Sequence, residues 1–123
     1  MEDEALSRMS LTEVSGAIAK RKVSSLEVVR NNVAQLDKHG SSLNCLARLF
    51  TENVLKDAKK ADLELASGNS LGRLHGVPLT HKDMFYRAGQ ITACGSKICE
   101  NYFPETTATV LLNLEHEGAL DLG

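Results

Sequence analysis

The strongest constraint on the fold is a change of residue pattern near residue 68. Up to Gly68, apolar residues recur at helical spacing, and each stretch begins at a residue that can cap a helix. From His75 to Ile98, glycine, proline, threonine and serine separate short apolar runs, which is typical of strands and functional loops. The sequence therefore predicts one domain over residues 1–123. Its residues 1–68 are mostly helical, and residues 69–123 form a strand and loop segment with one helix.

Two capping boxes locate the first helices. In Ser10-x-x-Glu13 and again in Ser24-x-x-Glu27, each side chain can accept the other residue's backbone N–H. Gly40 is the predicted end of the second helix, because glycine adopts the left-handed conformation that terminates many helices. Two consecutive helices with separate caps predict a helical hairpin.

The remaining elements alternate between strand and helix. Residues 44–50 (NCLARLF) are predicted as a strand, Thr51 can cap a helix that ends at Gly68, and residues 67–73 have turn composition. The threonine pair at 106–107 can cap a last helix with its stop at Gly118, and residues 119–123 begin another strand. This order predicts an α/β fold, in which a helical N-terminus precedes part of a mixed, partly parallel β-sheet flanked by helices.

The composition argues against several classes of protein. The chain has 123 residues, of which 42% are hydrophobic and 24% charged, and its net charge is -2. Its dispersed lysines and arginines are outnumbered by acids, so neither nucleic acid nor an anionic membrane is indicated as a partner. No apolar run approaches the roughly 20 residues that a membrane span needs. The acidic start and three cysteines without zinc spacing fit a cytoplasmic protein with free thiols.

The clearest chemistry lies in segment 74–85, LHGVPLTHKDMF. The segment reads as a turn at Gly76 and a short strand from Pro78, with Lys82 at its end. Apolar neighbours on both sides predict burial, and desolvation would let the amine act as a base near neutral pH. The alternative is an exposed charge pair with Asp83, the common interpretation of a Lys-Asp dipeptide. Because such a pair would keep the lysine charged, we expect Asp83 to accept backbone N–H groups of the loop instead.

The histidines of this segment argue weakly for a metal site. His75 and His81 are six residues apart, His116 is distant, and no acidic cluster lies beside them. We therefore expect no metal and no cofactor, with His81 as a partly buried hydrogen-bonding side chain behind the lysine. Cys94 has no identifiable histidine partner and is expected to pack rather than react.

An ordered series of motifs resembles the amidase signature family of hydrolases. The series is LGRLHGVPLTHKD (71–83), Gly89 with T-x-x-G-S (92–96), N-Y-x-P (101–104), A-T-V (108–110) and E-G-A-x-x-x-G (117–123). Their order and gaps are similar to the family's over essentially the whole chain after Ser10. The resemblance implies an incomplete amidase signature fold, as the N-terminal part of a larger α/β domain with a mixed central sheet flanked by helices.

The resemblance also implies roles for individual residues. Family members cleave amides with a Ser–cis-Ser–Lys triad, and Lys82 matches the triad lysine. Gly95 and Ser96 would lie near the active site, Gly95 for close approach and Ser96 for a hydrogen bond. The two triad serines belong to a glycine- and serine-rich signature that does not occur in these 123 residues, and Ser70 is no substitute. The chain is therefore expected to supply the lysine base and to be inactive alone.

Three functions remain open from the sequence. The first is hydrolysis of a small-molecule amide, and the second is the role of the amidase component in a tRNA-dependent amidotransferase. The third is a non-catalytic α/β interaction domain in which Lys82 is exposed. The resemblance is compatible with a homodimer, because many family members dimerise, and an uncovered strand edge or apolar helix face would promote self-association.

Overall fold

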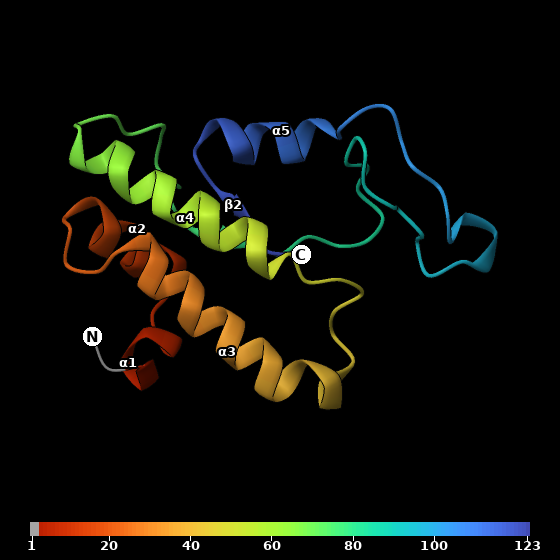
Figure 1. Ribbon diagram of the computed structural model, residues 1–123, viewed down its shortest axis with the longest axis horizontal. Helices are drawn as coiled ribbons and strands as arrows, with labels where there is room; N and C mark the ends of the chain where they lie inside the picture. Colours follow the sequence, from red (N-terminus) through yellow and green to blue (C-terminus); the bar gives the residue numbers. More distant parts are fainter. Residues whose placement is uncertain (1–2) are drawn as a thin grey trace.

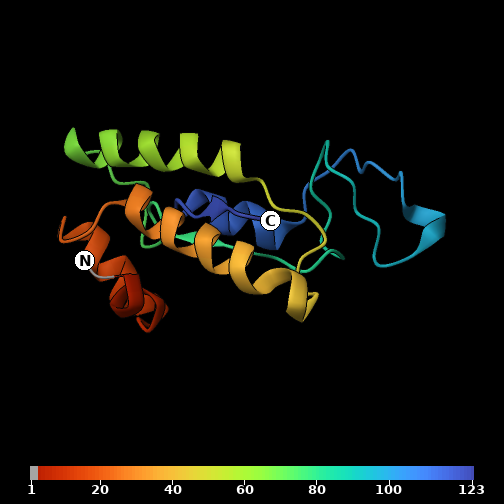
Figure 2. The same cartoon turned by 60° about the horizontal axis from the view of Figure 1, so that its bottom comes forward.

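The structure of the chain, a computed structural model, describes residues 3–123. Its first half holds four helices: α1 (Asp3–Ser7), α2 (Leu11–Ala19), α3 (Ser25–Leu43) and α4 (Thr51–Ala66). Its second half holds two strands, one 3-10 helix and one further α-helix: β1 (Pro78–Leu79), η1 (Lys97–Cys99), α5 (Thr109–His116) and β2 (Leu120–Asp121). Helices α3 and α4 lie side by side in both views (Figures 1 and 2). No helix within the described residues combines the length and apolar composition needed to cross a membrane.

Both predicted capping boxes are present. The backbone N–H of Ser10 donates to Glu13 Oε2 at 2.7 Å, and that of Ser24 donates to Glu27 Oε2 at 2.8 Å. In return, the hydroxyl of each serine accepts the backbone N–H of its glutamate. Helices α2 and α3 therefore begin where the sequence predicts, because two of their free N–H groups are satisfied locally.

The predicted end of α3 at Gly40 is wrong. The helix continues to Leu43 and ends at Asn44, whose φ of 48° is left-handed. Gly40 is buried, and a Cβ added there would meet only Leu46 Cδ1 at 3.7 Å, so the helical conformation is accommodated. Asparagine tolerates the left-handed conformation better than most residues and provides the stop later than expected.

The predicted strand over residues 44–50 is also wrong. This segment is irregular and none of its residues is buried. One backbone hydrogen bond, from Phe50 N to Leu122 O at 3.0 Å, ties its end to the segment that follows β2. The segment must leave the end of α3 and enter α4, and a single bond beside β2 does not make a ladder.

The sheet is small and parallel. β1 pairs with β2 in a register that aligns Pro78 with Leu120 and Leu79 with Asp121. Backbone bonds continue past the strands, where His81 N donates to Gly123 O at 3.1 Å. The strand predicted to begin within residues 119–123 is thus present as β2, and its pairing is parallel. The described residues form two strands rather than part of a broad mixed sheet. Helix α5 lies in the connection between them, as parallel pairing requires.

Two apolar clusters hold the helices against the strands. One joins α2, the start of α3 and the approach to β1 through Ile18, Val28 and Val77. The other joins α3, α4 and the end of β2 through Val29, Val54 and Leu122. Helix α3 contributes to both, so it connects the N-terminal helices to the end of the sheet.

Residues 84–108, which we call the arm, extend away from the helices (Figures 1 and 2). The arm contains η1 and exposes six large apolar side chains: Met84, Phe85, Tyr86, Ile98, Tyr102 and Phe103. The expected threonine cap at its end is absent, because α5 begins after Ala108 without a side-chain cap. Thr107 Oγ1 instead accepts the backbone N–H of Ala88 at 3.0 Å and closes the arm on itself.

Candidate functional site

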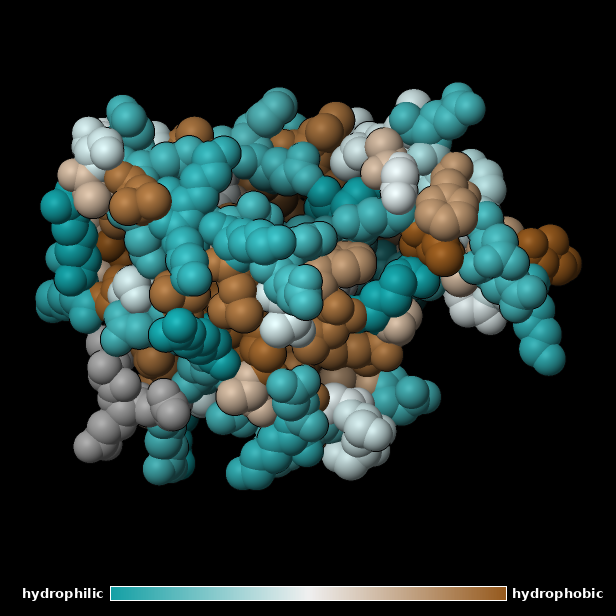
Figure 3. All heavy atoms as spheres, viewed as in Figure 1, coloured by the Kyte–Doolittle hydropathy of each residue, from teal (hydrophilic) through white to brown (hydrophobic). Residues whose placement is uncertain are grey.

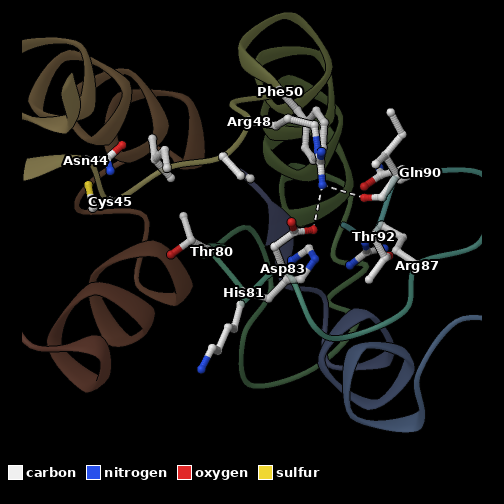
Figure 4. Close-up of a pocket in the computed structure, with 15 residues that line it drawn as sticks. Asn44, Cys45, Arg48, Phe50, Thr80, His81, Asp83, Arg87, Gln90 and Thr92 are labelled. Atoms are coloured by element: carbon white, nitrogen blue, oxygen red, sulfur yellow. Dashed lines mark hydrogen bonds and ion pairs between the residues drawn. The ribbon is translucent and has the colours of Figure 1, made fainter. Parts of the chain in front are cut away.

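A cavity of about 340 Å³ lies at the carboxyl ends of the two strands. Its lining comes from the residues after β1 (Thr80–Asp83), from Gly123 after β2, from the connection between α3 and α4, and from arm residues including Gln90 and Thr92 (Figure 4). In α/β proteins, ligands bind at this end of parallel strands. The lining within the described residues has hydroxyl, amide, imidazole, carboxylate and cationic groups but no serine.

Lys82 lines this cavity, and its side chain is exposed. The carbonyl of Lys82 accepts the backbone N–H groups of Met84 at 2.7 Å and Phe85 at 3.1 Å, so the chain turns sharply after it. The two apolar residues after the lysine, Met84 and Phe85, are themselves exposed. The expected burial of Lys82 is therefore wrong for residues 3–123, although the residue lies beside the cavity.

Asp83 organises the loop as expected. Its Oδ1 accepts hydrogen bonds from Arg48 at 2.7 Å and from the backbone N–H of Ala93 at 3.3 Å, and its carbonyl accepts Cys94 N at 3.0 Å. Within the described part of the chain no ion pair joins it to Lys82. Its carboxylate therefore serves the neighbouring loop rather than the lysine.

Arg48 is a site residue that the sequence reasoning missed. Its guanidinium points to Asp83 and also donates to Ile91 O at 2.5 Å (Figure 4). It thus connects the segment before α4 to the residue after Lys82 and to the arm. No pattern singled it out, since it lies in the stretch predicted as a strand.

The loop over residues 92–96 packs beside Asp83. Cys94 and Gly95 both have left-handed φ values, 52° and 67°. Ser96 Oγ accepts the backbone N–H of Ile98 at 3.3 Å and caps η1, so its hydrogen bond lies within its own loop. A Cβ on Gly95 would meet no atom within 4 Å, so this glycine provides a turn, and no close approach to it is present in residues 3–123.

His75 and His81 have different surroundings. His75 is buried, with Nε2 2.9 Å from Ala61 O and Nδ1 accepting Leu71 N at 3.2 Å, so both ring nitrogens are engaged by backbone. Such a histidine holds the loop before β1 and has no nitrogen free for a metal. His81 is partly buried as expected, with Nδ1 3.3 Å from Asp121 Oδ1.

Asp121 and Arg87 complete a charged cluster that the sequence did not reveal. Arg87 Nε lies 2.8 Å from Asp121 Oδ2, and the Arg87 guanidinium also contacts Glu115 of α5. Three of these side chains are largely shielded, with exposed fractions of 16% for His81, 14% for Arg87 and 18% for Asp121. The charges of Arg87 and Asp121 are poorly hydrated and would be costly unless paired, so these contacts fix the residues that make them.

Comparison with known proteins gives consistent matches. The family profile described as Amidase matches residues 27–123. A component of the Nitrosococcus oceani glutamyl-tRNA(Gln) amidotransferase is 38% identical over 93% of this chain and 23% of its own length. A Mycobacterium bovis protein named as a putative amidase, AmiD, is 33% identical over 100% of this chain and 26% of its own length.

The backbone of the chain also superposes on solved structures of amide-cleaving enzymes. A structure of fatty acid amide hydrolase superposes with a TM-score of 0.92 at 28% identity, over 98% of this chain and 21% of that protein. A crystal structure of an amidase gives a TM-score of 0.81 at 31% identity, over 94% of this chain and 26% of that protein. The chain thus spans about a quarter of the length of the proteins that it matches.

Proposed function

The chain belongs to the amidase signature family, and on that premise we propose that it supplies the lysine base of an enzyme that hydrolyses small-molecule amides. The observation that carries this proposal is the place of Lys82. It follows β1 at the carboxyl end of a parallel strand pair, lines a polar cavity and lies within the segment that the family profile matches.

In the proposed mechanism, Lys82 acts as a neutral amine. It takes a proton, relayed through a bridging serine, from a nucleophilic serine that attacks the amide carbonyl. Backbone N–H groups stabilise the oxyanion, and the proton returns to the leaving amine as the C–N bond breaks. Water, deprotonated by the same lysine, then hydrolyses the acyl-enzyme ester. Under this proposal both serines come from outside these 123 residues, in keeping with a cavity lining that holds no serine among the described residues.

The mechanism requires that Lys82 lose much of its solvent in the working enzyme. An ammonium in water stays protonated at neutral pH, and burial is what favours the neutral amine. The exposed neighbours Met84 and Phe85 are apolar, which is the kind of surface that a further layer of protein would cover. The proposal therefore expects this layer to come from the remainder of an amidase domain.

The direct test restores that remainder. The chain is produced together with the part of a matched amidase that follows the matched quarter, and ammonia release from simple amides is measured. Lys82→Ala should lower kcat by about 10² to 10⁴, the usual contribution of a general base. Lys97→Ala, which removes an exposed arm lysine, should leave kcat unchanged.

Two results would contradict the proposal. Full activity of the Lys82→Ala hybrid would exclude Lys82 as the base and favour a non-catalytic interaction domain. Turnover of an amide by the 123-residue chain alone would show that no outside serine is needed.

A second candidate rests on the similarity to the Nitrosococcus oceani amidotransferase component. In this alternative the same lysine serves an amidotransferase, and the ammonia released from an amide donor passes to a glutamyl-tRNA. Hybrids built on the matched amidotransferase component and on a stand-alone amidase separate the two roles. Ammonia transfer to glutamyl-tRNA only with the other components present would favour the amidotransferase, and release from simple amides without them would favour the amidase.

A further inference from the structure

The turn that carries Lys82 is held on both sides. Because the lysine side chain is exposed, burial does not set its direction within residues 3–123. The fold can, however, fix the backbone conformation of Lys82, and this determines the direction in which its side chain points. On the far side of the lysine, Asp83 is fixed by Arg48, Ala93 and Cys94.

Before the lysine, His81 is held by Asp121, the last residue of β2, and by Gly123. His81 N donates to Gly123 O at 3.1 Å, and His81 Nδ1 lies 3.3 Å from Asp121 Oδ1. The second oxygen of Asp121 lies 2.8 Å from Arg87 Nε. One carboxylate therefore contacts the residue before Lys82 and a residue of the arm beyond it, and so spans the turn.

The contacts of Asp121 are electrostatic. Both of its oxygens are buried, and neither makes a hydrogen bond of good geometry within the described residues. Arg87 is in turn paired with Glu115 of α5, so the negative charge of Asp121 is held between cationic or protonatable groups anchored on other elements. Removal of that charge leaves His81 and Arg87 without their shared partner at low solvent exposure.

From this geometry we infer that Asp121 is a positioning residue for Lys82. Its carboxylate holds His81 and Arg87 against the end of β2. These contacts fix the turn and thereby the direction in which the Lys82 side chain points. The inference rests on the proposed function of Lys82 as a base. Such positioning matters because a displacement of about 1 Å at a reacting group can cost about 10² in rate.

The first experiment measures order in the 123-residue chain by amide hydrogen exchange. Asp121→Asn keeps the shape and removes the charge, and Asp121→Leu also removes the polar atoms. The control is Glu4→Leu, which removes the carboxylate of the exposed Glu4–Arg8 pair at α1. The reporting amides are His81, which donates to Gly123, and Phe85, which donates to Lys82.

We expect exchange of these two amides to accelerate about tenfold in Asp121→Leu and less in Asp121→Asn, with the amides of α3 unchanged. Glu4→Leu should leave the exchange rates of both amides as they are in the natural chain. Unchanged exchange in Asp121→Leu would overturn the inference. Equal acceleration of all amides would also overturn it, because Asp121 would then be a general stabiliser.

The second experiment uses the active hybrid described above. Asp121→Leu should lower kcat by about 10² with KM unchanged, and Asp121→Asn should retain more of the rate, because position and not substrate binding is affected. A natural kcat in Asp121→Leu would overturn the inference while the base role of Lys82 stands. Full activity of Lys82→Ala would instead remove the proposed function, whatever Asp121 does.

Discussion

The helices and the arm contain apolar residues of similar kind but use them differently. In α3 and α4, Val29, Val54 and Ala58 are fully buried between the helices and the sheet. In the arm, Ile98 is 96% exposed and Phe103 56%. In Figure 3, apolar side chains are gathered between α3 and α4, and others stand apart from them at the outer end of the arm. The helices therefore carry their own core, whereas the arm is shaped by backbone hydrogen bonds and by ion pairs near its base.

The largest predicted difference in the free energy of unfolding is between alanine variants of two glycines that have the same φ. Gly76 and Gly89 both have φ of 74°, but a Cβ on Gly76 would lie 1.8 Å from Ser25 Oγ, whereas one on Gly89 would meet nothing within 4 Å. Left-handed backbone costs about 1–2 kcal/mol in either Ala variant. Overlap should add about 1–3 kcal/mol at Gly76 only. Denaturant unfolding measures the free energy of unfolding of Gly76→Ala and Gly89→Ala. Equal destabilisation would show that the helical part and the arm tolerate an added methyl group equally well.

A smaller contrast compares two serine caps. Ser24→Ala should lower the free energy of unfolding by about 1 kcal/mol, because α3 loses an N-terminal hydrogen bond. Ser96→Ala should change it by less than about 0.5 kcal/mol, because η1 has three residues and no buried side chain. Similar losses in thermal or denaturant unfolding would mean that the arm folds together with α3.

The same capping box predicts a pH dependence. Hydrogen bonds from the backbone N–H and the hydroxyl of Ser24 lower the pKa of Glu27 from its ordinary 4.5. A carboxyl group with a lowered folded-state pKa adds stability above the unfolded value, and this is lost as pH falls through the folded value. The stability advantage of the natural chain over Glu27→Gln should therefore shrink below about pH 4.5. An advantage that does not change with acidification would contradict the assignment.

The smallest effect on stability concerns exposed apolar residues. Ile98→Ser in the arm and Leu63→Ser on α4, where the leucine is 70% exposed, should each change the free energy of unfolding by less than about 0.5 kcal/mol. Self-association measured by sedimentation velocity should fall more for Ile98→Ser, because the arm clusters exposed apolar residues. An equal response of the two variants would show that the arm is not the associating surface.

Sequence reasoning worked best where structure depends on neighbours in the chain. The boxes at Ser10 and Ser24, and the loop role of Asp83, depend on residues within about ten positions. It failed for residues 44–50. Their apolar composition is compatible with a strand, but the segment has to connect α3 to α4 and is irregular. It also missed Arg48, Arg87 and Asp121, because their partners are 28 or more residues away in the chain.

Local chemistry and residue order alone fix the starts of α2 and α3, the turn at Gly76 and the motif series that carries family membership. The exposure of Lys82 and the contacts of Asp121 with His81 and Arg87 follow instead from the way in which the chain is packed. Burial and ion pairing depend on which segments, distant in the chain, come into contact. Parallel pairing of β1 with β2 brings residues 81 and 121 together, although they lie far apart in the chain.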